Sequence, residues 1–467
     1  GAHGDSGSAH NQGRTAILVL PITVLPRDNQ PPAFGGAVID FEPSQEKVID
    51  LLKLTTYPYP DDLDELAYTV LGAAPVGFTY ALNGNLLTLR ADDNAVKGST
   101  TSMTVGVRDD LSEGRSGRIE LTVVPSTRPL LRPAADLAIV KRGGTTTVDV
   151  LTNDQATNPF PGKPLTVIDI RGLGGASLPD GVQVEPSADS TSLTVTVAST
   201  AQPVDVNLQY QVADASNDPA RYVWGSITIS IQDRPDPVSN LSATGFGDRQ
   251  LTMRWNAGQF NNSPITAYRV TTISGGSVTG TTTCTGTTCT IATAGNGSAN
   301  AVRVSVVAIN AIGESDAVTT PDSVWSDVIP AAPGGLSASP LDHGLRISWN
   351  LVPNPAGGSP ISGYVVTAGG VASTVSCASS TCSTDIVDGS LANGSLVTYS
   401  VSARNDSFGP LTTWNMSSSQ ATPAGAPIAV APPLATASSD TAIQLDWSGT
   451  FTDNGRAISQ YTAAAYT

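Results

Sequence analysis

The sequence is poor in charge, in histidine and in long apolar runs. Only 14% of its 467 residues are Asp, Glu, Lys or Arg, whereas soluble domains average about 25%. The chain contains three His, which leaves few side chains for His-dependent catalysis. It has no run of about 20 apolar residues, the length that a membrane-spanning helix needs. These shortages exclude a typical transmembrane helix and argue against most His-based active sites.

Basic residues are the scarcer charged class. The chain has 24 Lys and Arg against 40 Asp and Glu, a formal net charge of −16. Such a balance argues against nucleic acid or an anionic lipid surface as a partner. The sequence does not begin with Met, and residues 1–13 are interpreted as a tag or a flexible lead-in.

Turn residues and β-branched residues are plentiful. Hydrophobic residues make up 40% of the chain, with 45 Gly and 33 Pro. The length suggests about three to five domains. Because Val, Thr and Ile outnumber strong helix formers such as Lys, Glu and Met, we predict an all-β fold.

Two sets of repeats divide the chain. In the first half, an apolar or alternating strand segment followed by a Pro-rich joint recurs about every 105 residues, at 13–20, 117–123 and 225–231. In the second half, a Trp after an alternating run is followed 13 to 15 residues later by a Tyr, in the pairs Trp255 and Tyr268, Trp349 and Tyr364, and Trp447 and Tyr461. Modules of this length with short alternating strands are typical of β-sandwiches.

The second repeat resembles fibronectin type III. The resemblance rests on the Trp, on the strand that carries the Tyr, and on the runs 304–310 and 399–405, each followed by a Gly. One departure is that Val302 and Val397 stand where the family usually has a Tyr, so its corner hydrogen bond is missing.

The first half resembles bacterial cadherin-like or Ig-like surface repeats. Segments 147–154 with 164–167, and then 210–214, carry that pattern, and 48–52 with 66–70 hold the same places one repeat earlier. Local propensity would allow a helix over Glu46–Leu54, but we predict a strand there because its repeat mate, the strand predicted over Thr147–Leu151, is β-branched.

We therefore expect an elongated tandem array of Ig-like sandwiches from a longer protein that extends in both directions. The Arg-over-Lys preference and the Ala, Gly and Thr content favour a bacterial origin, in the actinobacteria. The predicted parts are 1–27, a lead-in plus the last strand of a preceding module; 28–126 and 127–235, two cadherin-like or Ig-like modules; 236–330 and 331–425, two fibronectin type III modules; and 426–467, a partial one with an open apolar face.

Four cysteines form two Cys-x4-Cys pairs, Cys284 with Cys289 and Cys377 with Cys382. Each pair flanks a turn of four residues, so we predict two local disulfides at hairpin tips. A zinc site needs about four N or S ligands, which favours the disulfide interpretation. Disulfides indicate an oxidising, extracellular compartment.

An acidic run suggests a calcium site at the first module junction. The resemblance to cadherin-like repeats implies that Asp61, Asp62 and Asp64, with Asp28 and Asp109, supply oxygen ligands to Ca²⁺. The alternative is an acidic, solvated turn. No other cofactor is expected.

No catalytic residues are predicted. His343 lies in a predicted surface turn, and no acid and base are grouped in a pocket-forming context. The expected function is a stalk or adhesive array, on a cell surface or secreted, that contacts an extracellular protein of a host or neighbouring cell. Two alternatives stay open: spacer modules of a large extracellular carbohydrate-active enzyme, and binding of a cytokine-like signalling protein by the fibronectin type III modules, a suggestion from fold alone.

Overall fold

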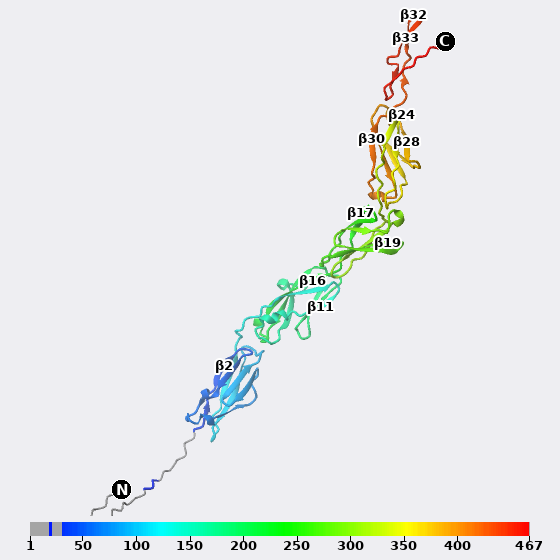
Figure 1. Cartoon of the computed structure of the whole chain (residues 1–467). Helices are drawn as coiled ribbons and strands as arrows, with labels where there is room; N and C mark the ends of the chain where they lie inside the picture. Colours follow the sequence, from blue (N-terminus) through cyan, green and yellow to red (C-terminus); the bar gives the residue numbers. More distant parts are fainter. Residues whose placement is uncertain (1–17, 21–29, 467) are drawn as a thin grey trace, which may run out of the picture. The chain divides into compact units, whose positions relative to one another are not determined.

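The computed structural model of the chain describes residues 18–20 and 30–466, and every regular element in these residues is a β-strand or a short 3₁₀ helix (Figure 1). The predicted all-β fold class is therefore confirmed. By packing, the described chain forms two units. The first holds the described residues up to Ala138 with Thr145–Thr196 and Val206–Ile229, and the second holds Ile139–Gly144, Val197–Asp205 and the residues from Ser230 onward.

The first sandwich spans residues 33–123. Its sheets have the orders β2-β9-β8-β5 and β3-β7-β6, and β2 runs parallel to β9. Side chains from both sheets share one hydrophobic core. The strands are β1 (Ala33–Phe34), β2 (Ala37–Phe41), β3 (Glu46–Asp50), β4 (Thr55–Thr56), β5 (Ala67–Leu71), β6 (Phe78–Asn83), β7 (Leu86–Ala91), β8 (Thr100–Arg108) and β9 (Gly117–Val123).

Local hydrogen bonds correct one prediction in this sandwich. The segment Glu46–Leu54, predicted as a single strand, is strand β3 only to Asp50 and then the 3₁₀ helix η1 (Leu51–Leu54). The Asp50 carboxylate accepts a hydrogen bond from the Leu52 backbone N–H and caps the turn. An Asp that bonds backbone two residues ahead competes with the strand ladder, which explains the early end of β3.

The second sandwich spans residues 135–232. Its sheets have the orders β10-β16-β15-β12 and β11-β14-β13. Strand β11 ends at Val148, three residues before the predicted end, because the chain turns there toward the 3₁₀ helix η3 (Asn153–Thr157). The strands are β10 (Ala135–Lys141), β11 (Thr145–Val148), β12 (Thr166–Gly172), β13 (Val182–Pro186), β14 (Leu193–Val197), β15 (Asp205–Ala213) and β16 (Val223–Gln232).

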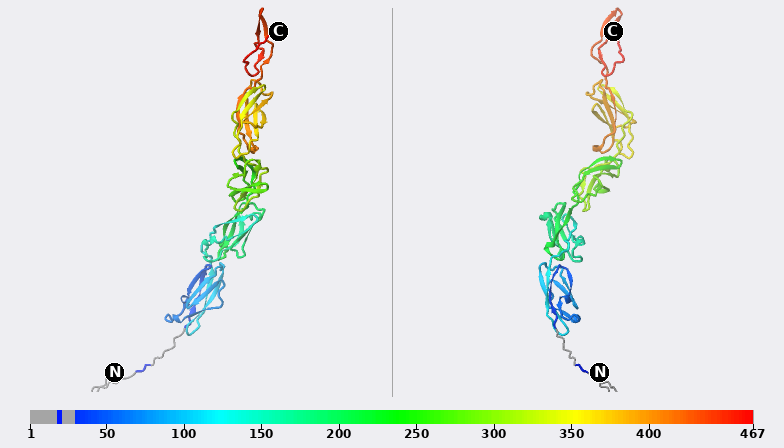
Figure 2. Two further views of the ribbon diagram at one scale, coloured as in Figure 1. Left: turned by 45° about the vertical axis from the view of Figure 1, so that its right-hand side comes forward. Right: turned by 90° about the vertical axis from the view of Figure 1, so that its left-hand side faces the viewer.

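The third and fourth sandwiches share one topology. The orders are β17-β18-β21 with β20-β19-β22-β23, and β24-β25-β28 with β27-β26-β29-β30; Figure 2 shows both from two further sides. The strands are β17 (Ser239–Gly247), β18 (Gln250–Asn256), β19 (Ala267–Ser274), β20 (Ser277–Cys284), β21 (Thr288–Ala292), β22 (Arg303–Ile309), β23 (Val318–Thr319), β24 (Ser337–Leu341), β25 (Gly344–Asn350), β26 (Gly363–Ala368), β27 (Val371–Val375), β28 (Thr381–Val387), β29 (Val397–Arg404) and β30 (Ser417–Ala421).

The repeated Trp residues form the centres of these two cores. Trp255 is 1% exposed and Trp349 is fully buried. Their rings contact Tyr268 and Tyr364 at centroid distances of 5.3 and 5.5 Å. The Trp and Tyr marks are therefore core residues in these sandwiches, as aromatic pairs of this geometry commonly are.

The C-terminal segment consists of two small sheets, β31-β34 and β32-β33, with β31 (Ile428–Ala429), β32 (Leu434–Ser439), β33 (Ala442–Asp446) and β34 (Phe451–Thr452). Trp447, which repeats Trp255, is 36% exposed and stacks on Tyr461 at 5.5 Å. Apolar side chains of this segment are exposed, among them Leu434 and Ile443, and the partial module expected over 426–467 stays a prediction.

The predicted N-terminal strand lies mostly outside the described residues. The three described ones, Leu18, Val19 and Leu20, are exposed and belong to no strand.

Candidate functional site

A buried ion pair lies at the end of the second sandwich that faces the first linker, residues 124–134. Arg221 Nε donates to Asp214 Oδ2 at 2.8 Å, and the two side chains are 7% and 2% exposed. The other guanidinium nitrogens donate to three linker carbonyls, those of Ser126, Arg128 and Pro129, at 3.5, 2.9 and 3.1 Å. The planar fork of Arg suits this multiple contact, and it holds the linker against the sandwich.

Local structure positions Arg221. The 3₁₀ helix η5 (Pro219–Arg221) begins after Asp218, whose carboxylate accepts from the Ala220 backbone N–H at 3.0 Å. Pro219 needs no N–H partner at the first helical position. Asp214 follows β15 directly and accepts from the backbone N–H and the hydroxyl of Ser216 at 3.1 and 2.5 Å.

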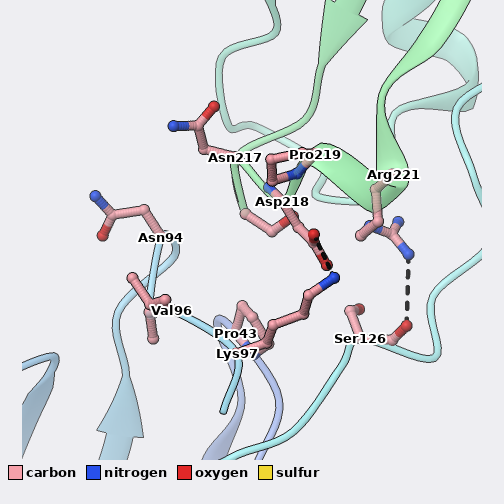
Figure 3. A pocket seen from close by; sticks show the side chains of 11 residues that line it. Pro43, Asn94, Val96, Lys97, Ser126, Asn217, Asp218, Pro219 and Arg221 are labelled. Atoms are coloured by element: carbon pink, nitrogen blue, oxygen red, sulfur yellow. Dashed lines mark hydrogen bonds and ion pairs between the residues drawn. The ribbon is translucent and has the colours of Figure 1, made fainter. Parts of the chain in front are cut away.

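Two charged pairs connect the first two sandwiches, and one of them lies in an open hollow of about 340 Å³ (Figure 3). Lys97 Nζ lies 2.7 Å from Asp218 Oδ1. Lys163 Nζ lies 2.5 Å from Asp93 Oδ2, outside the hollow. The hydrogen bond from Lys163, with bonds from Ser44 and Arg90, lowers the pKa of Asp93 to about 2. Opposite charges close to a carboxylate favour its ionised form.

Asp214 directly follows β15, and in the third and fourth sandwiches a polar residue directly follows the equivalent strand. Asn310 follows β22, and its Nδ2 donates to the carbonyl of Asp233 in the second linker, residues 233–238, at 2.7 Å. Asn405 follows β29, and its Nδ2 donates to the carbonyl of Val328, between β23 and β24, at 2.9 Å. The two side chains are buried, and the Oδ1 atom of each accepts from the next turn. Each Asn thus fastens the chain that enters its sandwich.

A second contact recurs at the opposite end of these sandwiches. Asn296 Nδ2 donates to Asp248 Oδ1 at 2.7 Å and to the Gly357 carbonyl of the next sandwich at 2.8 Å. Asn393 repeats it, donating to Asp342 Oδ1 at 2.6 Å and to Asn454 Oδ1 at 2.8 Å. Within the second unit, an Asn at an equivalent position therefore joins the third sandwich to the fourth and the fourth to the C-terminal segment.

The predicted calcium ligands lie in different settings. Asp109 follows β8, is 2% exposed, and accepts from the backbone N–H groups of Leu111 and Ser112 at 2.8 and 2.6 Å. The hydroxyl of Tyr57 reaches its other oxygen at 3.3 Å. Asp61, Asp62 and Asp64 lie around η2 (Leu63–Glu65), and Asp28 lies outside the described residues.

The described residues around the acidic loop, residues 61–65, do not form a complete cation site. Among residues 18–20 and 30–466, no three His, Cys, Asp or Glu side chains are grouped so as to hold a metal ion. Removal of water raises the pKa of Glu65, and the nearby charges of Asp62, Asp110, Asp64 and Asp109 raise it further. The loop therefore concentrates negative charge, and calcium binding stays a prediction.

The cysteines form the two expected disulfides. Cys284 is joined to Cys289 and Cys377 to Cys382, with Cα–Cα distances of 6.1 and 5.9 Å. Their setting differs from the predicted hairpin tip. Strand β20 ends at Cys284 in one sheet, whereas β21 contains Cys289 in the facing sheet. The first bridge therefore joins the two sheets of the third sandwich at their edge.

Sequence reasoning missed the linker contacts. One signal was available: an Asp or Asn stands directly after the corresponding strand in all four sandwiches, at Asp109, Asp214, Asn310 and Asn405. A polar residue that recurs at a strand end, where the ladder stops, indicates a turn or capping role. The partner Arg221 has no such repeat and carries no signal of its own.

No protein-family model and no curated protein matches the chain. Among solved structures, domains A168–A170 of titin match with a TM-score of 0.36 and 12% identity, over 63% of this chain and 99% of that one. The FN1–FN3 domains of chicken CNTN1 match with a TM-score of 0.27 and 12% identity, over 75% and 99%. These scores carry no functional argument. No helix among the described residues has the length and apolarity to cross a membrane. The chain is a tandem array of Ig-like and fibronectin type III-like β-sandwiches, a description that rests on its sheet orders.

Proposed function

We propose that the chain is a non-enzymatic segment of an extracellular or cell-surface protein, a stalk that presents binding surfaces to another extracellular protein. The observation that carries the proposal is that buried side chains in the loop after the equivalent strand hold successive linkers. Asn310 and Asn405 donate to the linker directly, and Arg221, paired with Asp214, does so in the second sandwich. A spacer that must keep its reach gains from linkers whose backbone is hydrogen-bonded to a folded module.

The disulfides support an extracellular location, because such bonds persist in oxidising compartments. Binding would fall to loops at the ends of the sandwiches or to exposed sheet edges. The formal charge of −16 favours a partner surface of basic character.

Small-angle X-ray scattering of the full chain tests the stalk. We expect an elongated particle in calcium and in chelator alike, with a distance distribution that broadens in the variant Asn310→Ala/Asn405→Ala because two linkers lose their anchors. Asn256→Ala, at an exposed Asn of the third sandwich, serves as the matched control.

A compact particle would refute the stalk. A particle that is stiffer in calcium than in chelator would support the ion site predicted at Asp28, Asp61, Asp62, Asp64 and Asp109. Scattering that is the same in calcium and in chelator would contradict that site.

A further inference from the structure

One buried hydroxyl in the second sandwich faces four acceptors. Tyr210 of β15 is fully buried. Its Oη lies 2.7 Å from Asp136 Oδ2 and 3.2 Å from Asp154 Oδ2. The carbonyl oxygens of Val150 and Ala134 lie 3.3 and 3.4 Å away. A phenol carries one hydrogen, so one donor serves four acceptor oxygens.

The outer oxygens of the two carboxyl groups already have donors. Asp154 Oδ1 accepts from the Ala134 backbone N–H at 2.7 Å, at the end of the first linker. Asp136 Oδ1 accepts from Asn153 Nδ2 at 2.9 Å. The two inner oxygens, Asp136 Oδ2 and Asp154 Oδ2, are the ones that share the Tyr210 hydroxyl.

The cluster is one donor hydrogen short when both carboxyl groups are ionised. If both carboxyl groups are ionised, the hydroxyl donates to one, and the other carboxylate oxygen faces a lone pair inside the fold. An unsatisfied buried acceptor is costly, and more so when it is charged. One added proton on Asp154 resolves this, because Asp154 then donates to Tyr210 Oη while Tyr210 donates to Asp136. Every polar atom of the trio then has a partner of the right kind.

We propose that the second sandwich binds one proton in the Asp154–Tyr210–Asp136 cluster, and that this proton makes the hold of the sandwich on the end of its first linker pH-sensitive. The proton is carried by Asp154, which is fully buried, whereas Asp136 is half-buried. Because Asp154 also holds Ala134, the cluster links the core to the linker.

The surroundings favour the protonated form. Burial raises the pKa of both Asp136 and Asp154, and the Asp136 charge raises that of Asp154 further. The groups acting on the two carboxyls from η3, β15 and the linker are Asn153, Tyr210 and the Ala134 N–H, with no basic side chain among the described residues that shift them. From β16, Gly225 lies so close to the Tyr210 ring that an added Cβ would be 2.4 Å from Cζ.

The raised pKa fixes the sign of the effect. A carboxyl that binds its proton more tightly in the folded state stabilises that state fully below the unfolded pKa of about 3.9. The stabilisation is lost as pH rises through the folded pKa. The second sandwich should therefore be tighter in mild acid than at neutral pH.

Hydrogen exchange on the full chain tests the proposal. After correction for intrinsic exchange, the amides of β10, η3 and β15 should exchange at least about threefold more slowly near pH 5 than near pH 7.5. In Asp154→Asn the amide donates to Tyr210 Oη at every pH. That variant should match or exceed the wild-type protection near pH 7.5 and lose the pH dependence. Asp180→Asn, at an exposed Asp of the same sandwich, should keep it.

Two results would overturn the proposal of a shared proton. One is a wild-type chain whose exchange lacks this pH dependence, and the other is several-fold faster exchange in Asp154→Asn than in the wild type near pH 7.5. If Asp154→Asn does not fold, infrared spectroscopy of the Asp-labelled wild-type chain decides. A protonated aspartic acid band that persists above about pH 5 supports the proposal, and its absence refutes it.

Discussion

At the scale of single residues, two kinds of side chain hydrogen-bond to the linkers: a single Asn, or an Asp paired with an Arg. Asn310 and Asn405 use Oδ1 to accept from the following turn and Nδ2 to donate to a linker carbonyl. Asp214 accepts at its turn in the same way, but a carboxylate has no N–H to donate. Arg221 supplies that donor by pairing with Asp214 and reaching the linker itself.

Removing Arg221 should therefore destabilise the second sandwich strongly. In Arg221→Met the Asp214 charge stays buried without its partner, and such a loss costs about 3–5 kcal/mol. Urea unfolding of the full chain, followed by hydrogen exchange of β15 and β16, measures the change. Arg234→Met removes the exposed pair with Asp316 and should cost about 0–1 kcal/mol.

The double variant Asp214→Asn/Arg221→Met gives the sandwich an Asn like Asn310. It should recover part of the stability lost in Arg221→Met. A cost equal to or larger than that of the single variant would contradict the shared role.

Asp93 should make the contact between the first two sandwiches acid-sensitive. Its pKa is lowered to about 2, first by Lys163. A lowered pKa means that the stabilisation is full above the unfolded value of about 3.9 and is lost as pH falls toward 2. Hydrogen exchange around Ser44 and Lys163 should therefore rise between about pH 4 and pH 2.

In Asp93→Asn this acid step should be absent, and exchange should already be raised at neutral pH. Asp40→Asn, at an exposed Asp of the same sandwich, should behave as wild type. An unchanged acid step in Asp93→Asn would show that other groups hold the contact.

At the scale of elements, the disulfide of the third sandwich acts between sheets. Strands β20 and β21 follow each other in sequence but belong to facing sheets, so the chain crosses the edge of the sandwich at the Cys pair. Cys289 is buried against the core that contains Trp255. The bridge therefore fixes the crossing between β20 and β21, which pair with strands of different sheets and not with each other.

Loss of this bridge should weaken the third sandwich without unfolding it. Closing so short a loop in the unfolded chain accounts for about 2 kcal/mol in the chain-entropy model. Cys284→Ser/Cys289→Ser should lower the unfolding free energy of this sandwich by that amount or less, as measured by urea unfolding with exchange readout on β18 and β22.

The fourth sandwich, with its own bridge intact, is the internal control for that measurement. A variant whose third sandwich is unfolded in buffer would show that the bridge does more than close a loop.

At the scale of the whole molecule, each folded part has its own interior. The first, third and fourth sandwiches contain separate hydrophobic clusters. The contacts that join the third and fourth sandwiches are both polar and aromatic. Asn296 donates to the Gly357 carbonyl, and Phe408 packs against Trp325 at a centroid distance of 4.7 Å. Contacts of each module with its neighbours alone suit an array built by repetition.

The sequence alone determined the all-β class, the core aromatic residues and the Cys pairs. Period-2 alternation, the spaced Trp and Tyr residues and the Cys-x4-Cys spacing are local features, and each acts over a few residues of chain. Local competition from Asp50 and from the turn after Val148 decided where two strands end.

Only the tertiary structure decided which distant groups meet. Arg221 reaches carbonyls more than 90 residues earlier in the chain, and Tyr210 meets Asp136 across 74 residues. Sheet order also placed Cys284 and Cys289 on facing sheets rather than at one hairpin tip. Alternation specifies which face of a strand is buried but not which strand lies beside it, so contacts between strands distant in sequence follow from packing.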